Sequence, residues 1–201
     1  GAQNTAVGQN ALQANTTASY NTAVGRSSLY YNTIGANNVA IGTYALENNT
    51  TASNNTAVGY YSTGANTTGT RNTALGYLSL RTNTTASDNT SIGYLSMLYN
   101  TTGASNTALG SYALQANTTA SNNTAVGMQA LLSNTTAASN TGVGKNALAT
   151  TTTGAENSAL GHNSLLQNTT GASNTAIGMS ALANNTTASQ NSAVGFEALK
   201  A

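Results

Sequence analysis

Hydrophobic and polar residues recur along this chain with a period of 17 residues. In the unit from Asn106 to Asn122, an aliphatic residue and a glycine stand fourth and fifth, and an Ala-Leu pair stands eighth and ninth. A fixed internal period is the signature of a repeat architecture. We therefore describe residues by unit position, from 1 to 17. The opening pentapeptide N-[TSV]-[ASG]-[VIL]-G returns without insertion or deletion at Asn4, Asn21, Asn38, Asn55, Asn72, Asn89, Asn106, Asn123, Asn140, Asn157, Asn174 and Asn191.

Three positions of the unit predict continuous rows of like residues. Position 4 is always aliphatic, position 5 is always glycine, and position 9 is leucine in ten copies, with Thr63 and Met97 as the exceptions. An obligatory glycine indicates a positive φ or a backbone approach too close for a Cβ, so an extended segment should end there. We expect these rows to form the structural ladders, beginning with Val7, Val24, Ile41 and Val58, with Gly8, Gly25, Gly42 and Gly59, and with Leu12, Leu29 and Leu46.

The repeat length favours an all-β fold. Helical solenoids need roughly 33 to 47 residues per repeat, whereas this unit has 17 with an internal glycine. A coil of two or three short strands fits, with coils stacked about 4.8 Å apart and a rod roughly 58 Å long. We predict a parallel β-solenoid (β-roll or β-helix) of twelve coils forming a single domain over 1–201. The asparagines at position 12 should bond to one another along the axis.

The strand segment suggests that both of its faces are packed. Side chains alternate between faces along a strand, and position 3 is only Ala, Ser or Gly while position 4 is only aliphatic. A solvated face would tolerate Lys or Glu. We expect an oligomer whose chains share a core, with a narrow monomeric coil as the alternative. The first and last units continue the pattern, whereas terminal repeats normally diverge, so we expect an uncapped segment of a longer fibre.

Composition argues against most other classes of function. Charged residues make up 4% of the chain and the net charge is +1, so neither nucleic acid nor an anionic membrane is expected as a partner. Apolar runs are too short to span a bilayer. His162 is the only histidine, no cysteine exists, and the four acids are scattered. General acid–base catalysis and metal binding need clustered groups, so we expect no enzyme, no metal site and no cofactor.

One segment resembles a known family. The run Asn38 to Gly42, N-V-A-I-G, resembles the N-x-V-A-I-G signature in the head domains of trimeric autotransporter adhesins. The longer phrase N-T-A-[VIL]-G-x-x-A-L-x-x-N-T-T is similar to repeats in phage tail fibres and bacterial surface proteins. The resemblance covers essentially the whole chain, although the unit has 17 residues where the adhesin heads have about 14. It implies a left-handed β-roll in a trimeric extracellular or virion fibre that spaces or presents a binding surface.

Two irregular or recurrent features have alternative interpretations. All ten tyrosines lie in the first 112 residues, mostly at variable positions, and either bind a carbohydrate or other cell-surface partner or pack against their neighbours. The stripe in question comprises Tyr44, Tyr60, Tyr61, Tyr77 and Tyr94. The motif N-T-T is either a glycosylation acceptor or a turn in which Asn bonds its own backbone. It begins at Asn15, Asn49, Asn66, Asn83, Asn100, Asn117, Asn134, Asn168 and Asn185.

The sequence thus favours a structural or adhesive fibre segment located outside the cell, on its surface or on a virion. An ice-binding solenoid is one alternative, because a low charge and ranks of threonine at strand spacing suit it. A filament assembled end to end from identical subunits is another. The threonine rank considered for ice comprises Thr16, Thr50, Thr67, Thr84, Thr101, Thr118, Thr135, Thr152, Thr169 and Thr186.

Overall fold

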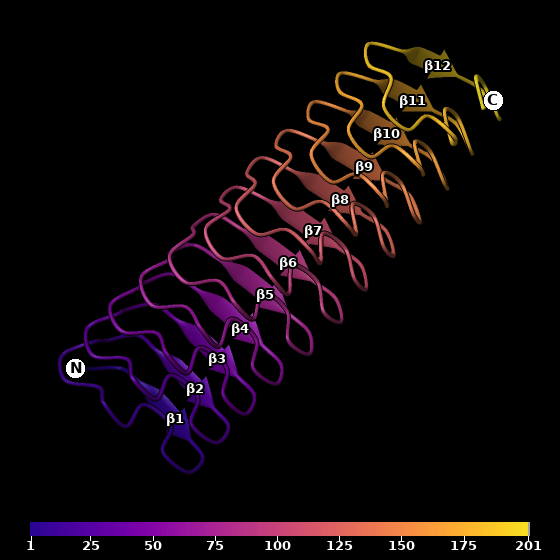
Figure 1. Cartoon of the computed structure of the whole chain (residues 1–201). Coiled ribbons are helices and arrows are strands. Elements are labelled where there is room, and N and C mark those ends of the chain that lie inside the picture. Colours follow the sequence, from indigo (N-terminus) through magenta and orange to yellow (C-terminus); the bar gives the residue numbers. More distant parts are fainter. Residues whose placement is uncertain (201) are drawn as a thin grey trace.

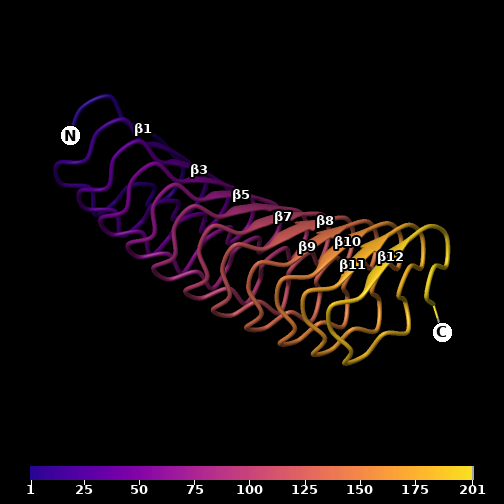
Figure 2. The same ribbon diagram turned by 90° about the horizontal axis from the view of Figure 1, so that it is seen from above.

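The structure is a computed structural model that describes residues 1–200. The chain forms a rod of stacked coils (Figure 1). Each coil contributes one three-residue strand, and the strands form a single parallel sheet in sequence order along one side of the rod (Figures 1 and 2). The prediction of an all-β parallel β-solenoid is confirmed. The strands are β1 Thr5–Val7, β2 Thr22–Val24, β3 Val39–Ile41, β4 Thr56–Val58, β5 Thr73–Leu75, β6 Thr90–Ile92, β7 Thr107–Leu109, β8 Thr124–Val126, β9 Thr141–Val143, β10 Ser158–Leu160, β11 Thr175–Ile177 and β12 Ser192–Val194.

The sheet register repeats the sequence period. Thr5 pairs with Thr22, and every later strand pairs with the residues that lie one unit along the chain. Because like residues meet in every pairing, the repeat itself specifies the register. Each coil has one strand rather than the expected two or three. The rest of the coil still bonds to its neighbours through the backbone, as from the Leu29 N–H to the Ala45 carbonyl at 3.0 Å.

Residues with positive φ explain why the rest of the coil is not extended. In the seventh coil Tyr112, Leu114 and Asn122 have φ of 60°, 51° and 62°. The same three positions, 7, 9 and 17, recur in this conformation along the rod. A left-handed residue cannot continue an extended segment, so each one bends the chain and turns a corner of the coil. Glycine at position 5 has a wider φ, 137° at Gly110, and ends the strand.

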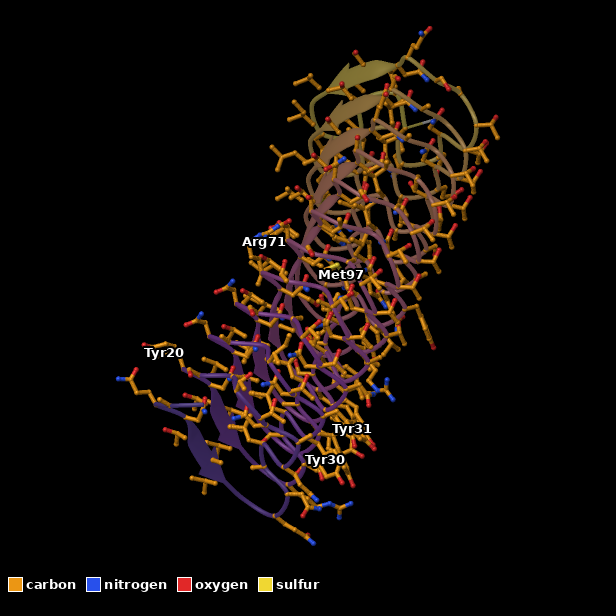
Figure 3. The ribbon with its side chains drawn as sticks, turned by 90° about the vertical axis from the view of Figure 1, so that its left-hand side faces the viewer. Tyr20, Tyr30, Tyr31, Arg71 and Met97 are labelled. Carbon is orange, nitrogen blue, oxygen red and sulfur yellow. The ribbon has the colours of Figure 1, made fainter. Side chains whose placement is uncertain are left out.

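The interior contains the small residue of the strand and the leucine of position 9. Ala108 and Leu114 are completely buried, and Met97 lies inside the coil where leucine is usual (Figure 3). Leu12, Leu29 and Leu46 are buried as the sequence predicted. The position 4 row instead faces outwards, with Val7 and Ile41 exposed and Val24 and Val58 half-buried. The core of one coil is therefore thin, with one large aliphatic side chain per turn.

Two columns of buried asparagine complete the interior. At position 12, Asn117 Nδ2 donates to Asn100 Oδ1 at 2.7 Å and to the Ala120 carbonyl at 3.0 Å. At position 1, Asn38 Oδ1 accepts the backbone N–H of Asn55 at 2.9 Å, one coil further along. A buried polar group is tolerated when it is hydrogen-bonded. The predicted axial asparagine ladder is confirmed. Its side chains fill part of the interior of each coil and also bond adjacent coils together.

Thr151 interrupts this ladder, and replacing it with asparagine is expected to stabilise the rod. Thr151 Oγ1 and the neighbouring Asn134 Oδ1 are buried without a hydrogen-bond partner. In Thr151→Asn the new amide can donate to Asn134 and accept from Asn168. We expect the free energy of unfolding to rise by about 1–3 kcal/mol, measured by urea denaturation. Thr153→Asn, at an exposed position, is the control and should change it by less than about 0.5 kcal/mol. Destabilisation by Thr151→Asn would contradict this account of the ladder.

Candidate interaction surfaces

The outer face of the sheet carries two parallel rows. Positions 2 and 4 both point away from the interior, because side chains alternate along a strand. Position 4 places an aliphatic side chain there in every coil, and Leu109 is 44% exposed. Position 2 is threonine except for Val39, Ser158 and Ser192. The rod therefore presents a continuous aliphatic row beside a row of hydroxyl groups.

Threonine recurs in three rows, at positions 2, 13 and 14, and the rows at positions 2 and 13 differ in hydrogen bonding. At position 13, which the sequence suggested as an ice-binding rank, Thr101 Oγ1 donates to the Thr118 carbonyl at 2.9 Å. The same bond recurs from Thr16 to Thr169, so these hydroxyl protons join coil to coil. At position 2, within residues 1–200, no hydroxyl has a hydrogen bond to the protein. Sequence reasoning missed the position 2 row, because the alternation of threonine, alanine and an aliphatic residue is visible in the sequence but the buried face is not.

The structure brings the five predicted tyrosines together on one flank. Tyr60, Tyr77 and Tyr94 at position 6 stack in a column, with ring centroids 5.4 and 5.5 Å apart. Tyr44 and Tyr61 at position 7 stack beside it with centroids 4.4 Å apart. The packing interpretation of these rings is therefore what the structure shows. Tyr112 adjoins this group, with its ring centroid 5.4 Å from that of Tyr94. Figure 3 shows Tyr20 on one flank of the rod and Tyr30 and Tyr31 on another.

Arginines close the shorter stack at both ends. The Arg26 guanidinium lies 4.9 Å from the centroid of the Tyr44 ring, and that of Arg81 lies 4.7 Å from the centroid of Tyr61. Cations favour the electron-rich faces of aromatic rings. Burial raises the pKa of the nearby Glu47 carboxyl, and the positive charges of Arg81 and Arg26 partly oppose that effect. This stack of two tyrosines between two arginines links four consecutive coils and covers both faces of each of its two rings.

The N-T-T motifs are turns, and the asparagine is completely buried in all of them except the terminal ones, at Asn15 and Asn185, where it is half-buried. Asn49 is completely buried, and its Nδ2 donates to the Ala52 carbonyl three residues on, at 2.9 Å. It also donates to Asn32 Oδ1 of the preceding coil at 2.9 Å. A glycosyltransferase needs this nitrogen free and exposed. In the folded chain the motif is therefore structural, and the buried asparagines are closed to modification.

Titratable groups do not converge within residues 1–200. No group of three or more His, Asp or Glu side chains is close enough there to hold a metal ion. His162 is exposed. Arg71 and Asp88 form an ion pair between adjacent coils at 2.6 Å, and this hydrogen bond holds the pKa of the Asp88 carboxyl below its usual value. Across the same residues, no helix is long and apolar enough to cross a membrane.

A hollow of about 230 Å³ lies at the last coils, between the ends of the interior leucine and asparagine rows. Its lining, which includes Leu182, Asn185 and Leu199, carries no titratable side chain.

Comparison with protein-family models, with curated proteins and with solved structures finds no match to this chain. The surfaces described above are therefore the basis for any proposal about function.

Proposed function

We propose that this chain is a structural segment of an extracellular or virion fibre, in which several copies pack together through the outer face of the sheet. The observation that carries the proposal is the exposed position 4 row, which is aliphatic in all twelve coils. Monomeric soluble proteins rarely expose a contiguous apolar patch of more than a few hundred Å². Burial against further copies explains why no charged residue interrupts the row.

The thin interior supports the same proposal. Apart from the coils with Thr63, Met97 and the exposed Leu199, each coil buries one large aliphatic side chain at position 9 and leaves its second one, at position 4, outside. Packing the sheets of neighbouring rods against one another would add that second row to a shared core, stabilising the fibre by roughly 25 cal/mol for each Å² of apolar surface removed from water. Three copies are favoured by the resemblance to trimeric adhesin heads. In such a fibre the flanks of the rods stay exposed and are free to present a binding surface.

Replacing an aliphatic residue of the row with a charged one is expected to dissociate the assembly. Leu109→Asp places a carboxylate where the copies meet, so the association constant should fall at least about tenfold while the coil remains folded. Sedimentation velocity measures the assembly, and circular dichroism measures the fold. Thr119→Asp, exposed on a different part of the coil, is the matched control and should assemble normally. A wild-type chain that sediments as a monomer at all concentrations would refute the proposal.

Ice binding is a second candidate because the position 2 hydroxyl groups have no partner within residues 1–200. These hydroxyls and the neighbouring aliphatic groups form regular ranks at strand spacing, about 4.8 Å. Such a surface can hold ordered water, but only if no other copy covers it. A monomer that shows thermal hysteresis, which Thr107→Lys abolishes, would establish this function in place of the fibre. Electron microscopy of the same sample would reveal end-to-end filaments, the third alternative.

A further inference from the structure

The tyrosine column on the flank of coils four to six is a feature that neither the fold nor the fibre requires. Position 6 is occupied elsewhere by residues as different as Gln9, Thr43 and Lys145. In three consecutive coils it is tyrosine. Tyr60, Tyr77 and Tyr94, which we call the tyrosine column, are 42%, 44% and 46% exposed. The column is thus an ordered and accessible set of identical phenols.

Stacking within the column covers the ring faces that lie between its members, including both faces of the middle ring, Tyr77. The planes of Tyr60 and Tyr77 differ by 10°, and those of Tyr77 and Tyr94 by 13°. Tyr94 forms a T-shaped pair with Tyr112, with ring centroids 5.4 Å apart, and Tyr60 forms T-shaped pairs with both Tyr44 and Tyr61. Stacking of a sugar needs an open ring face. The column is therefore poorly suited to the carbohydrate binding that the sequence suggested.

We propose that the tyrosine column is an oxidative cross-linking site, in which neighbouring rings are joined covalently as dityrosine. Each phenol loses one electron and one proton to give a phenoxyl radical. Two radicals on adjacent coils then form a carbon–carbon bond between positions ortho to the oxygens, and the ring hydrogens move to oxygen to restore two phenols. The electron acceptor is hydrogen peroxide acting through a haem peroxidase, and one peroxide is reduced to two waters for each cross-link.

Stacking favours this product because it holds the two reacting rings parallel and next to each other. Radicals on separate molecules must first meet by diffusion, whereas those of the column are already within 5.5 Å between centroids. Tyr77 has an ortho carbon on each side of its hydroxyl, so it can couple to both neighbours. The bonds would join three coils and oppose their separation. This proposal depends on the coil geometry alone and is independent of the fibre and its oligomeric state.

The test is peroxidase treatment of the purified full chain at low protein concentration. We expect dityrosine fluorescence, the loss of two hydrogen atoms per link by intact mass, and cross-linked peptides that join Tyr60 to Tyr77 and Tyr77 to Tyr94. The stacked pair Tyr44 and Tyr61 should couple as well. Exposed tyrosines that stack on no other ring, Tyr20 and Tyr99, should be linked at least about tenfold less often.

Tyr77→Phe separates the chemistry from the packing. Phenylalanine keeps the stacked ring but has no phenol to oxidise, so both links to residue 77 should vanish. The Tyr44–Tyr61 link should persist and serves as the internal standard, and Tyr99→Phe should leave the peptide pattern unchanged. Links spread evenly over all tyrosines, links found only between separate chains, or no link at all would each overturn the proposal.

Discussion

Gly93→Ala is expected to prevent the coils on either side of it from stacking. The φ of Gly93 is 142°, a conformation that residues with a Cβ rarely adopt. A Cβ there would lie 2.4 Å from the carbonyl oxygen of Gly110 in the next coil. Relief of that clash must separate the two backbones, and with them the 2.8 Å hydrogen bond from the Gly110 N–H to the Ile92 carbonyl. We expect a loss of more than about 4 kcal/mol, which is a large share of the stability of an ordinary domain.

Gly142→Ala provides the matched control because it makes the same chemical change in a strand. Gly142 stands at position 3, where other coils carry alanine, and its nearest obstacle to a Cβ is the Ala147 carbonyl oxygen at 3.2 Å. Alanine also restricts the unfolded chain, so this variant should lie within about 1 kcal/mol of the wild type. Urea denaturation followed by circular dichroism compares the two. Equal stability of Gly93→Ala and Gly142→Ala would refute the steric account of position 5.

The glycine and leucine rows could be predicted from the sequence because each has a local physical requirement. An invariant glycine signals close backbone approach, and Gly93 and its equivalents do approach the next coil. A leucine row signals a core, and Leu114 is buried. The repeat also specified the parallel register, because residues such as Thr5 and Thr22 stand one period apart. These features depend on one residue type at one position.

The sidedness of the strand could not be predicted in this way. Alternation places Ala108 and Leu109 on opposite faces but does not say which face is inside. The structure encloses Ala108 and exposes Leu109, because Leu114 already fills the narrow interior of the same coil. This outcome depends on the width of the closed coil, and the width depends on left-handed residues such as Tyr112. That position holds Asn, Ser, Tyr, Leu, Gln or Glu, and of these only asparagine favours a left-handed conformation, so the row as a whole does not signal one.

The candidate surfaces were predicted only in part, because they too depend on three-dimensional geometry that residue types do not specify. The tyrosines were recognised as an outward cluster, yet parallel stacking of Tyr60, Tyr77 and Tyr94 depends on side-chain geometry. The sequence placed the ice-binding threonine rank at position 13, where the Thr101 hydroxyl in fact donates a hydrogen bond to a backbone carbonyl. Hydroxyls without a protein partner stand at position 2 of the strand, as in Thr107, and at position 14 of the turn, as in Thr102. Counting threonines finds all three rows, but only the structure shows that the hydroxyls at position 13 are the bonded ones.

Asn117→Ala is expected to weaken the rod from within, although it leaves its surface unchanged. Asn117 is completely buried and takes part in three hydrogen bonds, to Asn100, to the Ala120 carbonyl and from Asn134. Removing its amide leaves Asn100 Oδ1 and one N–H of Asn134 buried without a partner. An unsatisfied buried group costs about 1–3 kcal/mol, and the cavity adds to that. We therefore expect a loss of about 3–5 kcal/mol in the free energy of unfolding, measured by urea denaturation.

Asn48→Ala tests whether this loss comes from burial, because Asn48 is exposed next to a ladder residue. Its variant should differ from the wild type by less than about 0.5 kcal/mol. Hydrogen exchange would then locate the damage, since the ladder joins adjacent coils and exchange should accelerate first in the coils on both sides of Asn117. Uniform acceleration along the whole rod would instead mean that the coils unfold as one unit. An Asn117→Ala variant as stable as Asn48→Ala would show that the backbone ladder alone holds the coils together.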